Sequence, residues 1–438
     1  MPLGQRAAVI GGSMAGLLAA RVLADHFEEV ILIERDVFPA DVADRKGVPQ
    51  GRHAHALLSS GRQTLEDLFP GFADELIANG GLRIDLKQVR WFDNGGYQAR
   101  ATGIQALAAS RPFLESHVRW RVRAIPNVRL LDAVDVDSLV MSVGNRRVEG
   151  VRTKPMKGGP EQTIECQLTV DATGRGSQTP SWLHAAGYPK PVEEVVSVGL
   201  GYSTRIFRRK ASDVDCDMAV IIPSAPPDRR GAAMLALEGD RWMVTLFGLL
   251  GDHPPTDHQG YLEFARSLPA PDIYNVIRDA EPLTDPLPFK YPASCRRRYE
   301  NLDRFPDGYL VFGDAICSFN PVYGQGMSVA ALQARALASS LNGGREGLAK
   351  RFFTAAAKVV DNPWLMAVGG DLRYPTVEGP RTAMGNFVNW YLGKLHIASR
   401  KDPALTLAFH TVANLLADPP TLLKPNIAYR VARGNIFH

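Results

Sequence analysis

A glycine-rich turn between two short apolar runs, within residues 7–34, restricts the fold of this chain more than any other feature. The apolar runs cover residues 7–10 and 30–33, and the segment between them, Met14 to Asp25, is predicted to be a helix. A strand, a tight turn, a helix and a second strand form a βαβ unit, whose two strands lie parallel in one sheet. We therefore expect an α/β fold with a parallel sheet at the N-terminal end.

The turn has the spacing of a dinucleotide-binding loop, which makes the expected sheet Rossmann-like. Gly11, Ser13 and Gly16 occupy the three key positions of a G-x-G-x-x-G pattern, with serine in place of the usual middle glycine. Serine is still small enough to leave N–H groups free at the helix start, where they can bind a pyrophosphate. Glu34 ends the second strand, where a carboxylate would bind ribose hydroxyls and repel a 2′-phosphate. The pattern disfavours NADP at this site and leaves NAD and FAD as candidates.

Charge and cysteine content exclude several other classes of protein. The chain has 438 residues and a formal net charge of +4, with scattered basic residues, so we expect no nucleic-acid partner. Its four cysteines lack the spacing of a metal site, which favours free thiols in a reducing cytoplasm and no bound metal. The apolar run after Arg6 is interrupted by glycines, unlike a signal peptide, and no run of about twenty apolar residues predicts a transmembrane segment. A cytoplasmic location is expected.

Beyond the first unit, the pattern of apolar residues changes twice. GVPQGRHAHALL, from Gly47, is interpreted as the opening of a helix that continues to Leu68, and Asn94-Gly95-Gly96 predicts a hairpin. From about residue 180 to 298, strand-like runs alternate with Pro, Gly and Asp turns, which predicts a separate, mostly antiparallel sheet. From about residue 347 to the end, the chain is predicted to be helical.

A second glycine motif follows the apolar run at residues 309–312. Gly313-Asp314 comes directly after it, and PVYGQGM, at 321–327, leads into an alanine-rich helix. Both glycine motifs resemble those of the flavoprotein monooxygenases of the para-hydroxybenzoate hydroxylase and squalene epoxidase superfamily. The resemblance implies that FAD is the cofactor and that Asp314 binds the ribityl hydroxyls. It also implies that the amides of residues 324–326 face the pyrimidine edge and the pyrophosphate.

Two arginine-containing segments extend this resemblance. Arg111, in the predicted helix SRPFLESHVRWRV, lies where the superfamily commonly has an arginine over the FAD phosphates. Arg45, in DRKGVPQGRHAHALL, resembles the arginine of bacterial polyether-type epoxidases and related actinobacterial flavoprotein oxygenases; with Gln50, His53 and His55 it would approach the flavin. Catalytic residues stay unknown because the flavin drives the chemistry, with Arg45 and His53 as candidates. The implied FAD contacts are Gly11, Ser13, Met14, Ala15, Gly16, Glu34, Arg35, Arg45, Arg111, Asp314, Pro321, Gly324, Gln325, Gly326 and Met327.

The segment TVDATGRGSQTPSWL departs from the superfamily pattern at one position. Asp171, Gly174 and Ser177 correspond to its Asp-Gly motif, but Ala172 replaces the glycine. This form resembles epoxidases and reductases of the superfamily more than phenol hydroxylases. It favours electrons that come from NADH or NADPH through a separate flavin reductase, although direct reduction by bound NADH or NADPH stays open. The structural alternative is a strand cap.

The resemblance implies a monooxygenase. Reduced FAD would react with O2 to give a C4a-hydroperoxide, which passes one oxygen atom to a substrate in a dry pocket. We expect epoxidation of an alkene in a hydrophobic secondary metabolite, with an aromatic hydroxylase or a geranylgeranyl-reductase-like alkene reductase as alternatives. A flavin-dependent halogenase would carry a Trp-x-Trp-x-Ile-Pro segment, which the chain lacks, and a non-enzymatic FAD-binding protein would show no turnover. The aromatic residues expected to line the pocket are Phe92, Tyr202, Phe247, Phe319 and Tyr323.

The expected domains follow from these motifs. Residues 1–85, 105–179 and 296–346 would form a discontinuous FAD-binding domain, residues 86–104 and 180–295 a substrate-binding β-sheet domain, and residues 347–438 a C-terminal helical region. NFVNWYLGKLHIASR, at 386–400, is expected to pack on the FAD-binding domain, while contact with a membrane surface or a dimer partner stays open. The protein would be a monomer or a homodimer.

Overall fold

A five-stranded parallel sheet organises one half of the protein. The computed structural model describes residues 2–55 and 57–436. The strands lie in the order β19–β11–β1–β2–β7, and every neighbouring pair is parallel. The residues at 7–10 and 30–33 are all buried, which explains their continuous apolar runs. The bounds are β1 (Gly4–Ile10), β2 (Phe27–Ile33), β7 (Val128–Leu131), β11 (Leu168–Asp171) and β19 (Tyr309–Val311).

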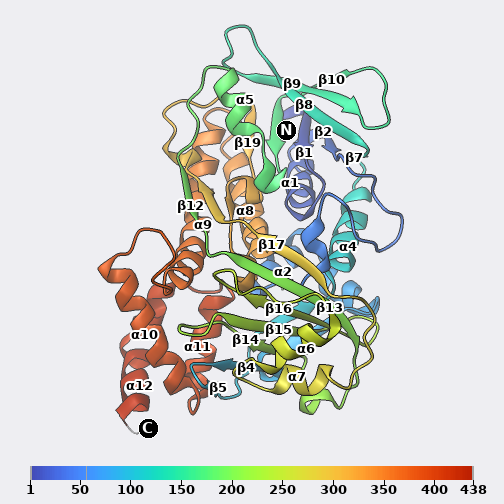
Figure 1. Ribbon diagram of the computed structural model, residues 1–438. Helices are drawn as coiled ribbons and strands as arrows, with labels where there is room; N and C mark the ends of the chain where they lie inside the picture. The colour runs from blue at the N-terminus through green and yellow to red at the C-terminus, as the bar shows by residue number, and fades with distance from the viewer. Residues whose placement is uncertain (1, 56, 437–438) are drawn as a thin grey trace.

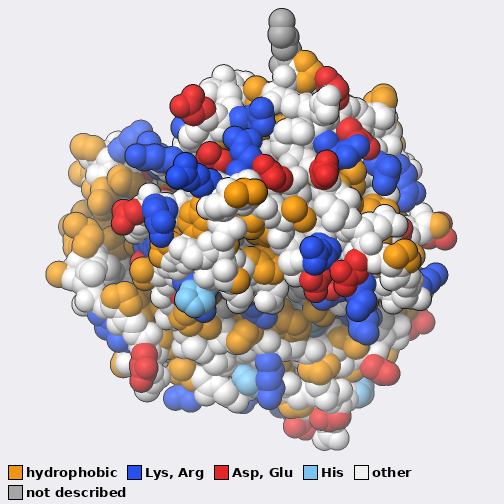
Figure 2. Space-filling view, turned by 90° about the horizontal axis from the view of Figure 1, so that it is seen from above, with side chains coloured by type: hydrophobic (Ala, Val, Ile, Leu, Met, Phe, Trp, Pro, Cys, Tyr) orange, Lys and Arg blue, Asp and Glu red, His pale blue; other side chains and the backbone are white. Residues whose placement is uncertain are grey.

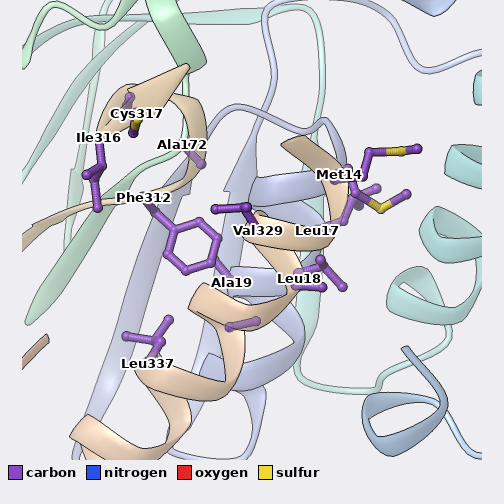
Figure 3. Packing of buried hydrophobic residues seen from close by; sticks show 14 of the residues in the cluster. Met14, Leu17, Leu18, Ala19, Ala172, Phe312, Ile316, Cys317, Val329 and Leu337 are labelled. Atoms are coloured by element: carbon purple, nitrogen blue, oxygen red, sulfur yellow. The ribbon is translucent and has the colours of Figure 1, made fainter. Parts of the chain in front are cut away.

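Two helices from distant parts of the sequence pack against each other beside this sheet (Figure 1). α1 (Met14–Ala24) follows β1, and α8 (Gly326–Leu341) comes after β19. Figure 3 shows Leu17 of α1 close to Val329 of α8, with Phe312 in the same cluster. A Cβ on Gly16 would lie 1.7 Å from the Gly11 carbonyl oxygen, so only glycine fits at the start of α1. The core therefore joins the two ends of the sequence that carry the glycine motifs.

A seven-stranded sheet forms the second layer, below the parallel sheet in Figure 1. Its order is β17–β13–β16–β15–β14–β4–β5, and the pairs are antiparallel except β14 with β4. α6 (His258–Arg266) and α7 (Asp272–Ile277) cover one face, where Tyr261 and Ile273 share a cluster with Trp242. On the other face, Tyr202 and Phe247 belong to the main core. The bounds are β4 (Val89–Asp93), β5 (Gly96–Tyr97), β13 (Leu200–Arg208), β14 (Ala219–Ile222), β15 (Arg230–Leu237), β16 (Arg241–Gly248) and β17 (Leu287–Tyr291).

The C-terminal region is helical, as predicted, but its second helix packs differently from the expectation. α9 (Leu348–Asp371) packs on α8, whereas the buried residues of α10 (Ala383–Ser399) join α11 (Pro403–Ala413) and α12 (Pro425–Ile436) in a separate cluster. The expected packing of residues 386–400 on the FAD-binding part is therefore wrong, because the other C-terminal helices cover that face. Within the described residues, no helix has the length and apolar content to cross a bilayer.

The helix expected from Gly47 to Leu68 is wrong in its first half. The chain forms one short turn, η1 (Pro49–Arg52), and α2 begins only at Ser59 and ends at Leu68. Between them the backbone hydrogen-bonds to a strand of the seven-stranded sheet: the Ala54 N–H donates to Thr245 Oγ1 of β16 at 3.1 Å. The predicted hairpin is confirmed by the pairing of β4 with β5.

The remaining elements are short. The helices are α3 (Phe72–Ala78), α4 (Arg111–Arg123) and α5 (Thr179–Ala185), and the strands are β3 (Leu82–Asp85), β6 (Gln105–Ala108), β8 (Val134–Met141), β9 (Val148–Pro155), β10 (Gln162–Glu165), β12 (Glu193–Val196), β18 (Ser294–Arg297) and β20 (Cys317–Ser318). The short 3-10 turns are η2 (Leu86–Gln88), η3 (Gly174–Gly176), η4 (Asp213–Cys216), η5 (Tyr299–Asn301), η6 (Gly313–Ala315), η7 (Pro321–Tyr323) and η8 (Pro419–Leu423).

Candidate cofactor and substrate site

The two glycine motifs meet at the carboxyl ends of β1 and β19. Gly313 has a φ of 69°, and a Cβ on it would lie 2.7 Å from the Cβ of Ala15. Gly326 starts α8, and a Cβ there would lie 3.9 Å from Asp314 Oδ1. Ligands of open α/β sheets bind outside the carboxyl ends of the strands. The structure thus brings residues from both motifs to the edge where such a ligand would lie.

Both helices at this edge start without a side-chain cap. In the part of the chain that the structure describes, neither Ser13 before α1 nor Gln325 before α8 caps its helix. The first N–H groups of a helix lack intrahelical partners and give its start about half a positive charge, so they suit a pyrophosphate. Gln325 Oε1 is also buried without a hydrogen-bond partner among the described residues. Met14 and Met327 bury their side chains in the core, so a ligand would meet their backbone.

Glu115 of α4 is a buried anion between two arginines. Arg45 Nη2 lies 2.5 Å from Glu115 Oε1, and Arg111 Nη2 lies 3.2 Å from Glu115 Oε2. Burial alone would raise the pKa of Glu115, but Arg111 and Arg45 lower it overall. Arg45 also donates to the Gly12 carbonyl at 3.2 Å, and Arg111 donates to Ser13 Oγ at 3.0 Å. Glu115 therefore holds both guanidinium groups beside the start of α1.

Glu34 ends β2 as the sequence indicates, and both of its carboxylate oxygens are bonded. Oε2 accepts the Gly12 N–H at 2.7 Å and lies 3.2 Å from Arg45 Nη1, while Oε1 accepts the Asp36 N–H at 2.9 Å. These contacts orient the carboxylate at the end of β2, next to the glycine turn. Arg35 follows Glu34 and is exposed.

Asp314 is reached by solvent but is surrounded by protein. Its side chain is exposed, yet burial among neighbouring groups raises its pKa, against the opposite influence of Arg111 and Arg175. The carboxylate is therefore open to solvent while protein atoms lie close around it. Uncapped helix starts, the paired arginines and the carboxylates of Glu34 and Asp314 fit a dinucleotide that has a pyrophosphate, a ribose and a polyol chain.

His53 connects this edge to the seven-stranded sheet. Its Nδ1 shares a 2.8 Å hydrogen bond with Thr204 Oγ1, and its ring meets that of Tyr202 edge-on at 4.6 Å between centroids. Phe289 stacks on Tyr202 at 5.1 Å, and Phe247 lies directly opposite Tyr202 on β16. Burial lowers the pKa of His53 to about 4, so its imidazole is neutral at neutral pH. Around His53, this sheet face presents aromatic rings and threonine hydroxyls and, among the described residues, no charged side chain.

Phe92 does not join the aromatic face, although the sequence analysis grouped it there. It packs against the cluster under α6 and α7, on the other face of the sheet, with its ring 5.1 Å from that of Tyr97. Phe319 belongs to the same core as Tyr202, and Tyr323 packs against it. Of the five predicted pocket residues, Tyr202 and Phe247 lie side by side on neighbouring strands, and the part of Phe319 and Tyr323 in the pocket stays a prediction.

Asp171 forms a strand cap, the structural alternative for its segment. Its Oδ1 accepts the Thr173 N–H at 2.9 Å, and its Oδ2 accepts the hydroxyls of Ser177 and Thr179 at 2.5 Å each. The side chain is fully buried. All of these contacts are local, so the segment fixes the turn after β11.

Comparisons with known proteins agree with this geometry. Residues 7–189 match the family model described as FAD dependent oxidoreductase. Protein Rv3254 of Mycobacterium tuberculosis is 34% identical over 419 residues, which cover 91% of this chain and 87% of that protein. Kynurenine 3-monooxygenase of Salinispora tropica is 25% identical over 351 residues, 74% of this chain and 70% of that protein. The chain belongs to the FAD-dependent monooxygenase superfamily. This monooxygenase also shares its fold with flavin-dependent brominase Bmp2, at a TM-score of 0.68 and 14% identity over 99% of both chains.

Three further residues of this FAD-dependent monooxygenase lie at the candidate site and were not predicted from its sequence. Glu115 lies four residues after Arg111, a spacing that on a helix normally indicates an exposed ion pair. Phe289 and Thr204 lie on strands whose order could not be read from the sequence. Helical spacing from Arg111 was the one signal that could have identified Glu115.

Proposed function

We propose that this enzyme transfers one oxygen atom from O2 to a hydrophobic small molecule held between the glycine motifs and the aromatic face of the seven-stranded sheet. One observation supports this above the others: His53 contacts Thr204 and Tyr202 of that face directly, while Gly51, two residues earlier, lies beside Arg111, where an added Cβ would be 3.7 Å from Arg111 Cγ. When bound, FAD supplies the electron transfer and the activation of O2. The proposed FAD contacts are those named from the sequence, with Asp314 at the ribityl chain and Arg111 near the phosphates.

The chain's own residues would orient the substrate and keep water away. Apolar rings are presented by Tyr202, Phe247 and Phe289. The hydroxyls of Thr204 and Thr245 hydrogen-bond to each other at 2.7 Å. Burial lowers the pKa of His55 to about 3, so neither it nor His53 brings a charge into the region at neutral pH. A dry, uncharged surface favours oxygen transfer over release of hydrogen peroxide.

Epoxidation of an alkene is the first candidate reaction, on the resemblance of the segments around Arg45 and Asp171 to epoxidases. Aromatic hydroxylation is the second, because kynurenine 3-monooxygenases are among the relatives. NADH or NADPH would be the electron source, and Ala172 favours delivery through a separate flavin reductase.

Stopped-flow absorbance with isotopically labelled O2 tests the proposal. The FAD-loaded enzyme is mixed anaerobically with NADH or NADPH, with and without a flavin reductase, and then with labelled O2 and a panel of alkenes and phenols. We expect label in the product, as an epoxide or a phenol. A reduced alkene without label would instead indicate the reductase, and oxygen consumption that yields only peroxide with every substrate class would contradict the proposal.

A further inference from the structure

The apolar stripe of α10 is covered along its second half and bare along its first. Tyr391, Leu395 and Ala398 are buried in the cluster with α11 and α12. At helical spacing toward the N-terminus, the same stripe continues through Met384 and Phe387, which are 67% and 45% exposed. The stripe therefore ends in side chains that the described part of the chain leaves uncovered.

Other large apolar side chains extend this bare surface. Trp390 is 59% exposed, and its ring lies 5.8 Å from that of Phe387. Leu365 of α9 is 66% exposed, and α9 meets α10 where Asn389 Nδ2 donates to the Gly369 carbonyl at 3.0 Å. Figure 2 shows hydrophobic side chains gathered at the left side of the molecule, where Figure 1 has α10. Contiguous exposed apolar groups of this kind mark interaction sites.

A hollow of about 400 Å³ with two arginines adjoins this surface. It is lined by Arg373, Arg381, Asn386, Asn389 and Trp390, among others. Within residues 2–55 and 57–436 the Arg373 guanidinium has no hydrogen bond or ion pair, and its backbone N–H donates to the Gly370 carbonyl. The Arg381 guanidinium donates only to backbone carbonyls. Both guanidinium groups are thus left without a carboxylate partner, beside a hollow that suits an anionic group.

The charge distribution along the chain also favours an anionic partner for this surface. Residues 372–438 contain eight basic and three acidic residues, a net charge of +5, while the whole chain has a net charge of +4. α10 itself contains no acidic residue. A basic rim beside exposed Trp, Phe and Met side chains is typical of surfaces that bind anionic bilayers.

We propose that the bare start of α10 inserts into an anionic lipid bilayer, with Arg373 and Arg381 next to the lipid phosphates. A second copy of the chain is a poorer occupant, because a two-fold contact through this face would set each copy's arginines against the other's. The proposal depends only on this surface and holds whatever the substrate of the enzyme is.

Vesicle sedimentation with the FAD-loaded full-length protein tests the proposal. The wild type should sediment with vesicles of phosphatidylcholine and phosphatidylglycerol, bind pure phosphatidylcholine weakly, and dissociate at high salt. The double variant Met384→Asp and Trp390→Asp should bind at least about tenfold more weakly. Both side chains are exposed, so FAD content and circular dichroism should match the wild type. Arg373→Glu should weaken binding to anionic vesicles alone.

A matched control separates this surface from general hydrophobicity. Val143 and Met156 lie in turns next to β8 and β9, at the opposite end of the molecule from α10 (Figure 1). Both are also exposed, and their double replacement by Asp should leave vesicle binding unchanged. Wild-type protein that fails to sediment with anionic vesicles would overturn the proposal. A concentration-dependent dimer that the Met384→Asp and Trp390→Asp variant abolishes, without vesicle binding, would assign the surface to a second copy.

Discussion

Glu115 links protein stability to the charge of the expected cofactor. It is the buried counter-ion of Arg45 and Arg111. Glu115→Gln keeps the shape but removes the charge, so the free energy of unfolding of the FAD-free protein should fall by about 3 kcal/mol. A bound pyrophosphate would return negative charge to the same arginines, so FAD should stabilise the variant more than the wild type. Thermal unfolding with and without FAD measures both effects.

Glu75 offers a control, because it pairs with Arg121 at 2.7 Å in a partly exposed position. Glu75→Gln should cost at most about 1 kcal/mol and should not change the FAD-induced shift. Equal FAD-induced shifts in wild type and Glu115→Gln would show that the two arginines do not face the pyrophosphate.

Asp371, at the end of α9, gives a pH prediction. Burial raises its pKa to about 7, although Asn320 and Tyr323 donate hydrogen bonds to it. Because the folded pKa lies above the unfolded value near 3.8, the folded state holds an extra proton from about pH 4 to 7, and stability falls as the pH rises through that window. Asp371→Asn should match the wild type at pH 4.5 and be more stable by about 2–4 kcal/mol at pH 8. Urea unfolding at both pH values measures the difference in the free energy of unfolding between the variant and the wild type. The prediction is wrong if that difference is the same at pH 4.5 and pH 8.

Residues that act through local geometry could be predicted, and those that act through tertiary contacts could not. Gly16 follows from the spacing of the loop, and its contact with the Gly11 carbonyl oxygen gives the reason. Glu115 is buried only because Arg45 reaches it from a segment seventy residues away. The predicted position of Phe92 in the pocket was wrong because alternation along a strand shows which residues share a face. It does not show which of the two faces packs toward the glycine loops.

At the scale of elements, a buried polar network joins the β4–β5 hairpin to the C-terminal helices. The Gln98 side chain hydrogen-bonds His396 of α10 at 3.1 Å and His410 of α11 at 2.8 Å, and His396 lies 3.3 Å from Asp93. Burial lowers the pKa of His396, against the influence of Asp93, and lowers that of His410 to about 3. His410 is therefore neutral at neutral pH in the folded protein, and its protonation would oppose the packing of α11.

This network predicts a loss of stability in acid. The folded pKa of His410 lies below the unfolded value of 6.5, so the unfolded state binds the extra proton as the pH falls from about 6.5 toward 3. Stability should fall by about 1.4 kcal/mol per pH unit for this histidine. His410→Gln, which can still donate to Gln98, should reduce the slope by that amount between pH 6 and 4.5. The same replacement at the exposed His184 is the control, and equal slopes in both variants would contradict the prediction.

Elements with strong local signals were predicted well, and the segment at 47–68 was not. Helical spacing identified α4, and Asn94-Gly95 identified the β4–β5 hairpin. The segment after Pro49 contains helix-forming residues, yet hydrogen bonding to Thr245 holds it extended. Tertiary contacts override local propensity wherever a segment crosses between two layers.

At the scale of the whole molecule, the parallel sheet explains why the superfamily was recognisable from the sequence while the substrate was not. β1 and β19 are separated in the sheet only by β11, so their glycine loops lie at one edge although some three hundred residues separate them. The glycine spacing of each loop can be read directly from the sequence. The aromatic face instead combines single residues from β13, β16 and β17 with His53. These residues are far apart in the sequence, so they form no short motif that could be recognised.

If FAD binds as proposed, in contact with both glycine loops, its binding should stabilise the whole molecule. Binding to the folded state alone contributes about 2.7 kcal/mol when free FAD is one hundred times its Kd. The Asp314 side chain makes no hydrogen bond or ion pair in the described chain, and burial disfavours its charge. Asp314→Ala should therefore leave the FAD-free protein at least as stable as the wild type while removing most of the FAD-induced shift. Asp303→Ala, at an exposed position, is the matched control and should keep the full shift. Differential scanning calorimetry, with FAD content measured by absorbance, tests this: an Asp314→Ala protein that keeps its flavin and its shift would show that the ribityl chain lies elsewhere.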